Sequence, residues 1–291
     1  MSEVPHHPSA EGAWRRREVL LGGLAAACAL APTARAGQGV AALPTCALSP
    51  ELTEGPFYLD RQKLRRDISE GKPGVPLVLR ITLFDARSCR PLHGAAVDVW
   101  HCDAAGVYSG FGAQGPGAMP GMGPGIGPGP GMGPPPFGPG PGMGPADGHP
   151  PPRPRITDHL GFLRGVQFTG VDGTAEFRSI VPGWYAGRAA HVHLKAHVGG
   201  KPRGRHYAGG HVCHTGQFGF AEDFYSAISP LQPYAQHQTP RTPLEQDGIL
   251  SGGAPAPLLR LNPLGSEPHQ GYLGSIAFTV DPDALARGWG E

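Results

Sequence analysis

Short segments rich in apolar, β-branched and aromatic residues recur along this chain, and turn residues bound each of them. This pattern is typical of β-strands, and no stretch keeps the 3.6-residue period of a long helix. Six strands are predicted, within Val75–Asp85, Gly94–Asp103, Phe162–Gly170, Val171–Val181, Ala189–Val198 and Gly271–Asp283. Short strands at turn-bounded intervals predict an all-β fold, with a β-sandwich core and long loops. The pair Asp172-Gly173 is typical of a hairpin turn between two of the strands.

Residues 110–154 interrupt the strand pattern. They hold 16 glycines, 15 prolines and four of the five methionines, in loose Met-Gly-Pro-Gly repeats. Such a segment has almost no apolar surface to bury, so we expect a disordered insertion with polyproline character. It begins two residues after Tyr108. We therefore expect it to lie at the mouth of the candidate site described below and to modulate access to that site.

The first 36 residues resemble an export signal. Arg15, Arg16 and Arg17 precede a short apolar stretch at 19–27, and Ala34-Arg35-Ala36 offers a cleavage site between small residues. Paired arginines before apolar residues match a twin-arginine signal, and the apolar stretch is too short for a good membrane span. The alternatives are an ordinary secretory signal, an uncleaved anchor, or a lipid-modified Cys28. The sequence thus predicts a periplasmic or extracellular protein with one domain at 37–291.

The charge balance argues against a nucleic-acid partner. The sequence has 24 Lys and Arg and 23 Asp and Glu, and residues 1–36 contain four of the former and three of the latter. Without that segment 20 charges of each sign remain, and the formal net charge is 0. Binding to nucleic acid depends on clustered basic residues that neutralise phosphates, and no basic run longer than three residues remains.

Four cysteines follow the predicted signal, namely Cys46, Cys89, Cys102 and Cys213. In an oxidising compartment they permit two disulfides in three pairings, one of which would join Cys89 to Cys102 between neighbouring strands. The sequence leaves the pairing open. Because no Cys-x-x-Cys pair is present, a cysteine-based zinc site is not expected.

Two histidines and two tyrosines form the candidate site. His191 and His193 are two residues apart in a predicted strand, so their imidazoles can share one face. Tyr185 lies on the turn that leads into this strand, and Tyr108 lies at the glycine-bounded end of an earlier one. Two phenols and two imidazoles form a hard, anionic ligand set that suits Fe(III). The simpler alternative for the histidines is an exposed polar strand face.

Three further histidines, His206, His211 and His214, fall in a glycine-rich stretch. We interpret this stretch as a loop and its histidines as surface residues.

Four segments, in this order along the chain, resemble the intradiol ring-cleavage dioxygenases, and in particular the exported, single-domain branch related to protocatechuate 3,4-dioxygenase and catechol 1,2-dioxygenase. They are LTEGPFYLD (Leu52–Asp60), DVWHCDAAGVYSG (Asp98–Gly110), FLRGVQFTGVDGTAEFRSIVPGWYAGRAAHVHLK (Phe162–Lys195) and HTGQFGF (His214–Phe220), which span most of residues 45–225.

The resemblance implies a mononuclear non-haem Fe(III) centre and roles for individual residues. The implied iron ligands are Tyr108, Tyr185, His191 and His193. Tyr185 would be the ligand that the substrate displaces, and Arg188 would stabilise the substrate anion during oxygen attack. Gln217 matches a glutamine close to the family's site, with a strand-end polar residue as the alternative. Trp100 matches a residue that lines the substrate pocket, with plain core packing as the alternative.

The implied reaction is cleavage of a catechol-type diol by O2 between its two hydroxyl-bearing carbons, which gives a cis,cis-muconate. The identity of the catechol is open, and a homo-oligomer is compatible with the sequence. Two other readings compete with this one. They are a non-catalytic β-sandwich binding module and a different exported, histidine-ligated metalloprotein that holds copper or zinc.

Overall fold

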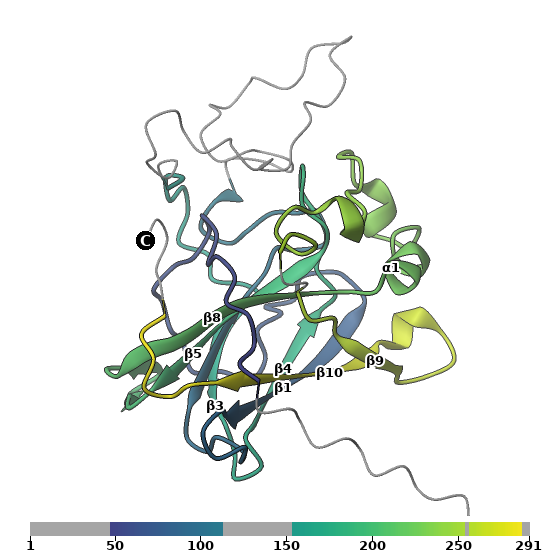
Figure 1. Cartoon of the computed structure of the whole chain (residues 1–291). Coiled ribbons are helices and arrows are strands. Elements are labelled where there is room, and N and C mark those ends of the chain that lie inside the picture. The colour runs from purple at the N-terminus through teal and green to yellow at the C-terminus, as the bar shows by residue number, and fades with distance from the viewer. Residues whose placement is uncertain (1–46, 113–152, 254–255, 287–291) are drawn as a thin grey trace, which may run out of the picture. The chain divides into compact units, whose positions relative to one another are not determined.

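Strands dominate the residues that the computed structural model describes, 47–112, 153–253 and 256–286 (Figure 1). The strands are β1 (Pro76–Asp85), β2 (Ala96–Trp100), β3 (Arg164–Phe168), β4 (Thr174–Ile180), β5 (His191–Val198), β6 (Lys201–Arg203), β7 (His206–Ala208), β8 (His211–Gly219), β9 (Arg260–Pro263) and β10 (Tyr272–Val280). The helices are α1 (Glu222–Ile228) and three short 3₁₀ helices, η2 (Tyr234–Gln236), η3 (Leu244–Gln246) and η4 (Pro268–Gln270).

The strands form two four-stranded sheets and one two-stranded sheet. The first sheet has the order β4-β1-β10-β9, with β1 parallel to β10, and the second is antiparallel throughout with the order β3-β2-β5-β8. Both sheets contribute to one buried core, which contains Leu79 and Phe278 from the first and Val99, Leu194 and Phe218 from the second. The predicted all-β sandwich is therefore confirmed.

Each predicted strand contains an observed strand, but one connection differs from the prediction. Asp172 and Gly173 do form a turn, in which the amide of Thr174 donates to Asp172 Oδ1 at 3.0 Å. The turn does not close a hairpin, because β3 belongs to the second sheet and β4 to the first. Local residues determine that the chain reverses. The burial of Ala175 and Phe177 in the shared core determines which sheet β4 joins.

The stretch that we interpreted as a glycine-rich loop contains three strands. His206 is exposed at the start of β7 and His211 is half-buried at the start of β8, but His214 is only 3% exposed. The His214 ring packs 5.6 Å from the ring of Phe278, so its interpretation as a surface residue was wrong. The signal is weak in the sequence because glycines and histidines conceal the alternation along β8.

Strand β5 is buried on both faces over most of its length. Val192, Leu194 and Ala196 face the core between the sheets, while the alternating histidines and lysine face outward. The segment at 52–64 covers this outer face, since Leu52 donates to Thr215 of β8 and Leu64 bridges to β3. Consequently His191 and His193 are each 1% exposed. The alternative of an exposed polar strand face was wrong.

The structure excludes one of the disulfide pairings that the sequence left open, the one between Cys89 and Cys102. Cys89 is disulfide-bonded, whereas Cys102 and Cys213 carry free, buried thiols, so a Cys89–Cys102 bridge does not form. A disulfide is typical of proteins that leave the reducing cytoplasm. Export of this protein stays a prediction, because the segment 1–36 lies outside the described residues.

Most of the predicted insertion, 113–152, also lies outside the described residues. Its first residues do not match the prediction that it has almost nothing to pack. Phe111 is buried beside Phe57, with ring centroids 5.2 Å apart, and the amide of Gly110 donates to Asp158. Phe111 therefore packs into the domain, and the bounds of the insertion stay a prediction.

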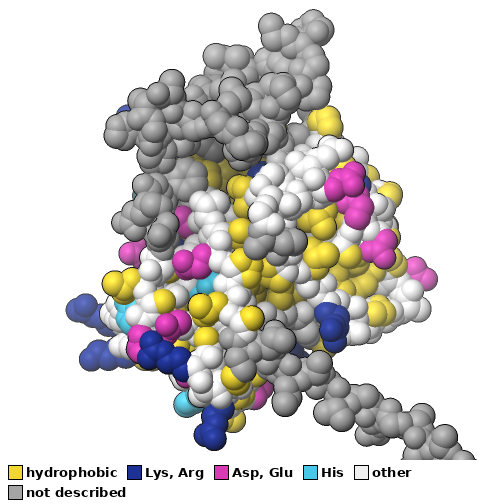
Figure 2. Space-filling view, viewed as in Figure 1, with side chains coloured by type: hydrophobic (Ala, Val, Ile, Leu, Met, Phe, Trp, Pro, Cys, Tyr) yellow, Lys and Arg dark blue, Asp and Glu magenta, His cyan; other side chains and the backbone are white. Residues whose placement is uncertain are grey.

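The described surface shows side chains of every type on the face in Figure 2, where Lys and Arg side chains project between acidic and apolar ones.

Within the described residues, no helix is long and apolar enough to cross a membrane.

Candidate metal centre

Paired residues on neighbouring strands of the second sheet form the part of the site that lies on the sheet itself. In the second sheet, Trp100 of β2 pairs with Arg164 of β3 on one side and with His193 of β5 on the other, and His193 pairs with Gln217 of β8. Residues that are direct partners in neighbouring strands point to the same face. The row therefore presents four side chains on the outer face of the sheet, and His191 lies two residues further along β5.

Two loops bring the tyrosines to this row. Tyr108 lies between β2 and β3 and Tyr185 between β4 and β5. The loops touch backbone to backbone: a Cβ on Gly106 would lie 2.2 Å from the carbonyl oxygen of Trp184, and one on Gly183 would lie 2.4 Å from that of Ala104. Only glycine permits so close an approach. These glycines therefore let the two phenols meet over β5.

A buried arginine fixes the position of the Tyr108 loop. Arg164 donates from Nε to Ser109 Oγ at 2.8 Å, and from Nη2 to the carbonyl oxygens of Ser109 at 2.9 Å and Phe57 at 2.7 Å. The Phe57 ring stacks on the Tyr108 ring at 4.6 Å. The loop and the covering segment thus hold Tyr108 from both sides.

The four predicted ligands come together around one point. His191 Nε2 lies 3.3 Å from the phenol oxygen of Tyr108, 3.5 Å from that of Tyr185 and 3.0 Å from His193 Nε2. Atoms bound about 2.0–2.2 Å from one ion, at angles near 100°, lie roughly 3.1–3.4 Å from one another. The three distances from His191 Nε2 are therefore compatible with donors that share a single metal ion. Their role as iron ligands stays a prediction.

The oxygen donors of this set are phenols. Within the described part of the chain, no group of three or more His, Cys, Asp or Glu side chains could hold a metal ion. The oxygen atoms that the described structure places within 3.5 Å of His191 Nε2 are the phenol oxygens of Tyr108 and Tyr185. This composition favours a hard, highly charged ion over a structural zinc.

Burial keeps all four donors neutral in the absence of a cation. Desolvation raises the pKa of Tyr108 and Tyr185 above that of a free phenol. It lowers the pKa of His191 to about 3 and that of His193 well below the ordinary value. The imidazole nitrogens are thus available as ligands, and a cation bound here would favour loss of the phenol protons.

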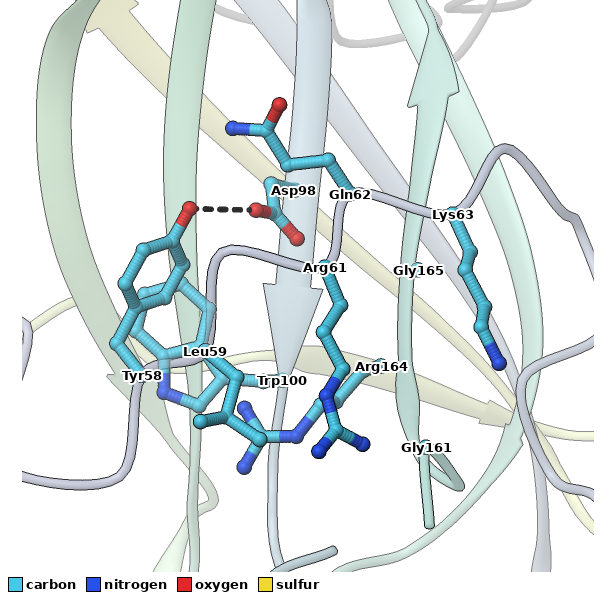
Figure 3. Close-up of a pocket in the computed structure, with 10 residues that line it drawn as sticks. All are labelled: Tyr58, Leu59, Arg61, Gln62, Lys63, Asp98, Trp100, Gly161, Arg164 and Gly165. Carbon is cyan, nitrogen blue, oxygen red and sulfur yellow. Dashed lines mark hydrogen bonds between the residues drawn. The ribbon is translucent and has the colours of Figure 1, made fainter. Parts of the chain in front are cut away.

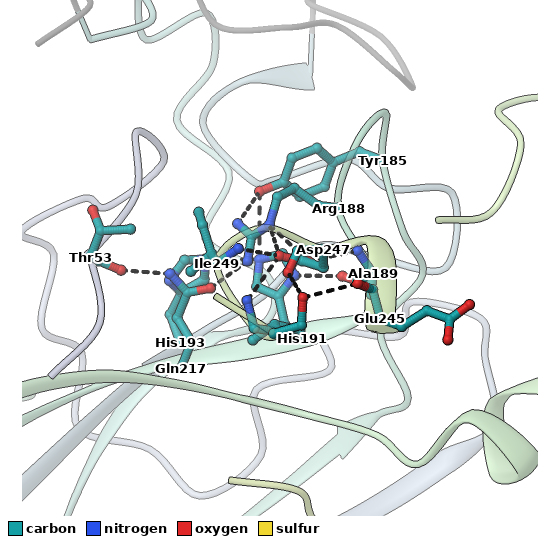
Figure 4. A network of polar contacts seen from close by, with 12 residues as sticks. Thr53, Tyr185, Arg188, Ala189, His191, His193, Gln217, Glu245, Asp247 and Ile249 are labelled. Atoms are coloured by element: carbon teal, nitrogen blue, oxygen red, sulfur yellow. Dashed lines mark hydrogen bonds and ion pairs between the residues drawn. The ribbon is translucent and has the colours of Figure 1, made fainter. Parts of the chain in front are cut away.

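Arg188 connects the tyrosine, the glutamine and a carboxylate (Figure 4). Its Nη1 donates to Tyr185 Oη at 3.2 Å, its Nη2 to Gln217 Oε1 at 2.6 Å, and its Nε to Asp247 Oδ2 at 2.9 Å. Burial opposes its charge, but neighbouring Tyr185 and Asp247 raise the pKa of Arg188 above its usual range. The predicted residues Arg188 and Gln217 therefore both reach the site.

Asp247 is fully buried at the site, and no pattern in the sequence predicted it there. Besides Arg188, it accepts hydrogen bonds from the amides of Ala189 at 2.8 Å, Ile249 at 2.9 Å and Leu250 at 3.0 Å. Burial disfavours its charge, but Arg188 and these amides hold the pKa of the carboxyl below its ordinary value. In the sequence Asp247 stands 59 positions after Arg188 and directly before a glycine. An Asp-Gly pair indicates only a turn.

Trp100 lies against a predicted ligand. It is buried, and its ring stacks on that of His193 with centroids 4.9 Å apart and an interplanar angle of 9°. Tyr58 packs on Trp100 at 4.8 Å. Trp100 therefore lies next to the candidate centre within a buried cluster, and its role in lining a substrate pocket stays a prediction.

A pocket beyond Trp100 contains a buried carboxyl group (Figure 3). It is lined by Tyr58, Leu59, Arg61, Gln62, Lys63, Asp98, Trp100, Gly161, Arg164 and Gly165. The phenol of Tyr58 donates to Asp98 Oδ2 at 3.1 Å. Burial raises the pKa of Asp98 from 3.8 to about 7, against the opposing effects of Tyr58, Arg164 and Lys195.

This pKa predicts a pH-dependent stability. The folded protein binds the Asp98 proton more tightly than the unfolded chain does, and this proton binding stabilises the fold. The resulting contribution to the free energy of unfolding is complete below about pH 4 and is lost as the pH rises to about 7. Between these pH values the free energy of unfolding falls with a limiting slope of about 1.4 kcal/mol per pH unit. Asp98→Asn should remove it, and denaturant unfolding of both proteins from pH 4 to 8 measures the difference. Parallel curves would show that Asp98 titrates normally.

Solved structures that match most of the chain include two that are 27% identical to it. An intradiol ring-cleavage dioxygenase from Tetranychus urticae is 27% identical with a TM-score of 0.63, and the match covers 82% of this chain and 97% of that one. A second solved structure, described as a dioxygenase, is also 27% identical with a TM-score of 0.61 and the same coverage. No protein-family model and no curated protein matches the sequence. Across most of its length, this chain thus matches the intradiol ring-cleavage dioxygenases in structure.

Proposed function

We propose that this protein cleaves a catechol-type diol with O2 at a mononuclear non-haem Fe(III), giving a cis,cis-muconate-type product. The observation that carries the proposal is the convergence of two buried phenol oxygens and two buried imidazole nitrogens, with three of the donors within 3.5 Å of His191 Nε2. Fold similarity alone would not support it, because one fold serves many functions. The ligand chemistry of the site adds the specific support.

Fe(III) held by Tyr108, Tyr185, His191 and His193 would supply a Lewis acid that activates a bound diol. The remaining contributions come from the protein. In its ionised form, Tyr185 would accept a proton from an incoming diol at its phenol oxygen. Arg188 Nη1, 3.2 Å from that oxygen, orients the phenol and keeps a positive charge beside it.

The surroundings of the four donors exclude water. A buried cluster contains both tyrosines together with Phe57, Trp100, Cys102 and Phe111. In such an apolar enclosure, the charge of Arg188 acts on a developing anion more strongly than it would in water. Gln217 holds the guanidinium from the opposite side and donates to the carbonyl oxygen of Thr53 at 2.6 Å.

The proposal predicts a coloured protein with one iron per chain. Two tyrosinates on Fe(III) give a visible charge-transfer absorption, which a zinc or copper(I) site lacks. We expect metal analysis to find iron, a chelator to abolish both the colour and catechol cleavage, and Fe(III) but not Zn(II) to restore them. A colourless zinc protein would support the other metalloprotein reading. A protein that binds catechols without metal or turnover would support the binding-module reading.

A further inference from the structure

The two histidines of the centre are held in different ways. His191 Nδ1 lies 2.6 Å from the carbonyl oxygen of Ala189, a contact that fixes the orientation of its ring. His193 Nδ1 is buried and has no hydrogen-bond partner within the described residues. Metal-binding histidines almost always donate their second ring N–H to a protein group or water, which sets the direction of the ring. For His193, the contacts that the described structure does provide are packing contacts.

Packing on two sides constrains the His193 ring. The indole of Trp100 lies flat on one face, and Tyr58 packs against that indole in turn. At the edge of the imidazole, the backbone of Gly55 approaches so closely that a Cβ there would lie 3.0 Å from His193 Cε1. Gly55 also has a positive φ of 69°, a conformation that favours glycine.

The turn that carries Gly55 is anchored to the strands of the site. Glu54, buried next to it, pairs with Lys195 of β5 at 2.5 Å, and Lys195 lies two residues from His193. The carbonyl oxygen of Thr53 accepts the hydrogen bond from Gln217 of β8. Gly55 is therefore held at a fixed place relative to the imidazole that it contacts.

We propose that Trp100 and Gly55 are positioning residues, which orient the His193 imidazole by packing on its face and edge where His191 relies on a hydrogen bond. This inference rests on the proposed function, since it concerns the same four donors. It assigns Trp100 a structural task toward a ligand, in place of a direct contact with substrate. It also gives a reason for glycine at position 55 beyond the turn itself.

Gly55→Ala tests the edge contact, and Gly71→Ala is its matched control. Gly71 has a φ of 73°, close to that of Gly55, but a Cβ added at Gly71 would meet no atom within 4 Å. Both variants therefore carry the same backbone strain, and only one touches His193. We expect Gly55→Ala to lose roughly 10–100-fold in iron affinity, the range for groups that orient a metal ligand. Gly71→Ala should stay close to the parent in iron affinity.

Three measurements separate the outcomes. Competition with a ferric chelator gives iron affinity, and the visible charge-transfer band reports the ligation of the iron by the tyrosinates in the holoprotein. In the metal-free protein, NMR of the imidazoles should show shifted His193 signals in Gly55→Ala and unchanged signals for His101, whose two ring nitrogens both have partners. If Gly55→Ala does not fold, Trp100→Phe, which shortens the stacking face, is compared in the same assays.

Equal iron affinity and unchanged His193 signals in Gly55→Ala and Trp100→Phe would overturn the inference while leaving the proposed function intact. A parent protein that binds no iron would instead contradict the proposed function. In that case the NMR comparison of the metal-free proteins still decides whether Gly55 and Trp100 orient the ring.

Discussion

Tyr108→Phe and Tyr185→Phe should each change the visible band of the iron-loaded protein and lower catechol turnover by at least about 100-fold, as expected when one preorganised polar group of an active site is removed. Each substitution deletes one of the two phenol oxygens near His191 Nε2 and leaves the ring in its aromatic cluster. Each variant therefore loses one of the two phenol donors and keeps the packing around it. Absorption spectra, iron content and turnover are measured on the same preparations.

The two variants should differ from each other. Tyr185 lies beside Arg188, so its loss removes the proposed proton acceptor as well as a ligand, whereas Tyr108 contacts no guanidinium nitrogen at hydrogen-bond distance in the described structure. Tyr272→Phe is a matched control, since this half-buried tyrosine of β10 packs on Phe224 of α1 and its substitution should alter neither colour nor turnover. An unchanged spectrum in both Tyr108→Phe and Tyr185→Phe would contradict the ligand assignment.

The parts of the site that could be predicted are those that depend on local spacing. His191 and His193 share a face because side chains alternate along a strand, and the register with β2 and β8 then places Trp100 and Gln217 beside them. The tyrosines were candidates from their places beside predicted strands, and the family resemblance supported them, since spacing alone does not show that their loops meet. That meeting depends on backbone contact at Gly106 and Gly183, which no local pattern reveals.

Non-local burial explains most of what sequence analysis missed. Along β5 the alternation of polar and apolar residues indicates a half-exposed strand, but the segment at 52–64 covers the polar face and makes it a buried site. The same effect hid His214, which faces Phe278 of a strand in the other sheet. Asp247 could not be paired with Arg188 because the 58 residues between them carry no sign of that contact.

The second large effect is expected at Arg188, where Arg188→Ala should keep iron but lose roughly 2–4 kcal/mol of transition-state stabilisation, or about 30- to 1,000-fold in kcat. The guanidinium touches Tyr185 and Gln217 but is not among the four donors, so iron content and colour should change little. Its charge is fixed at any working pH, which suits the stabilisation of a developing substrate anion.

The ion pair between Arg188 and Asp247 means that Arg188→Ala affects stability as well as catalysis. Removing Arg188 alone leaves a fully buried carboxylate without its cation, and breaking a buried pair in this way costs about 3–5 kcal/mol of stability. Arg188→Ala is therefore compared with Arg188→Ala/Asp247→Asn, which removes both charges and keeps the shape of the acceptor. Asp247→Asn alone retains the guanidinium and should retain more activity than either. If Arg188→Ala, folded and loaded with iron, turned over catechols at the parental rate, the catalytic role of this arginine would be wrong.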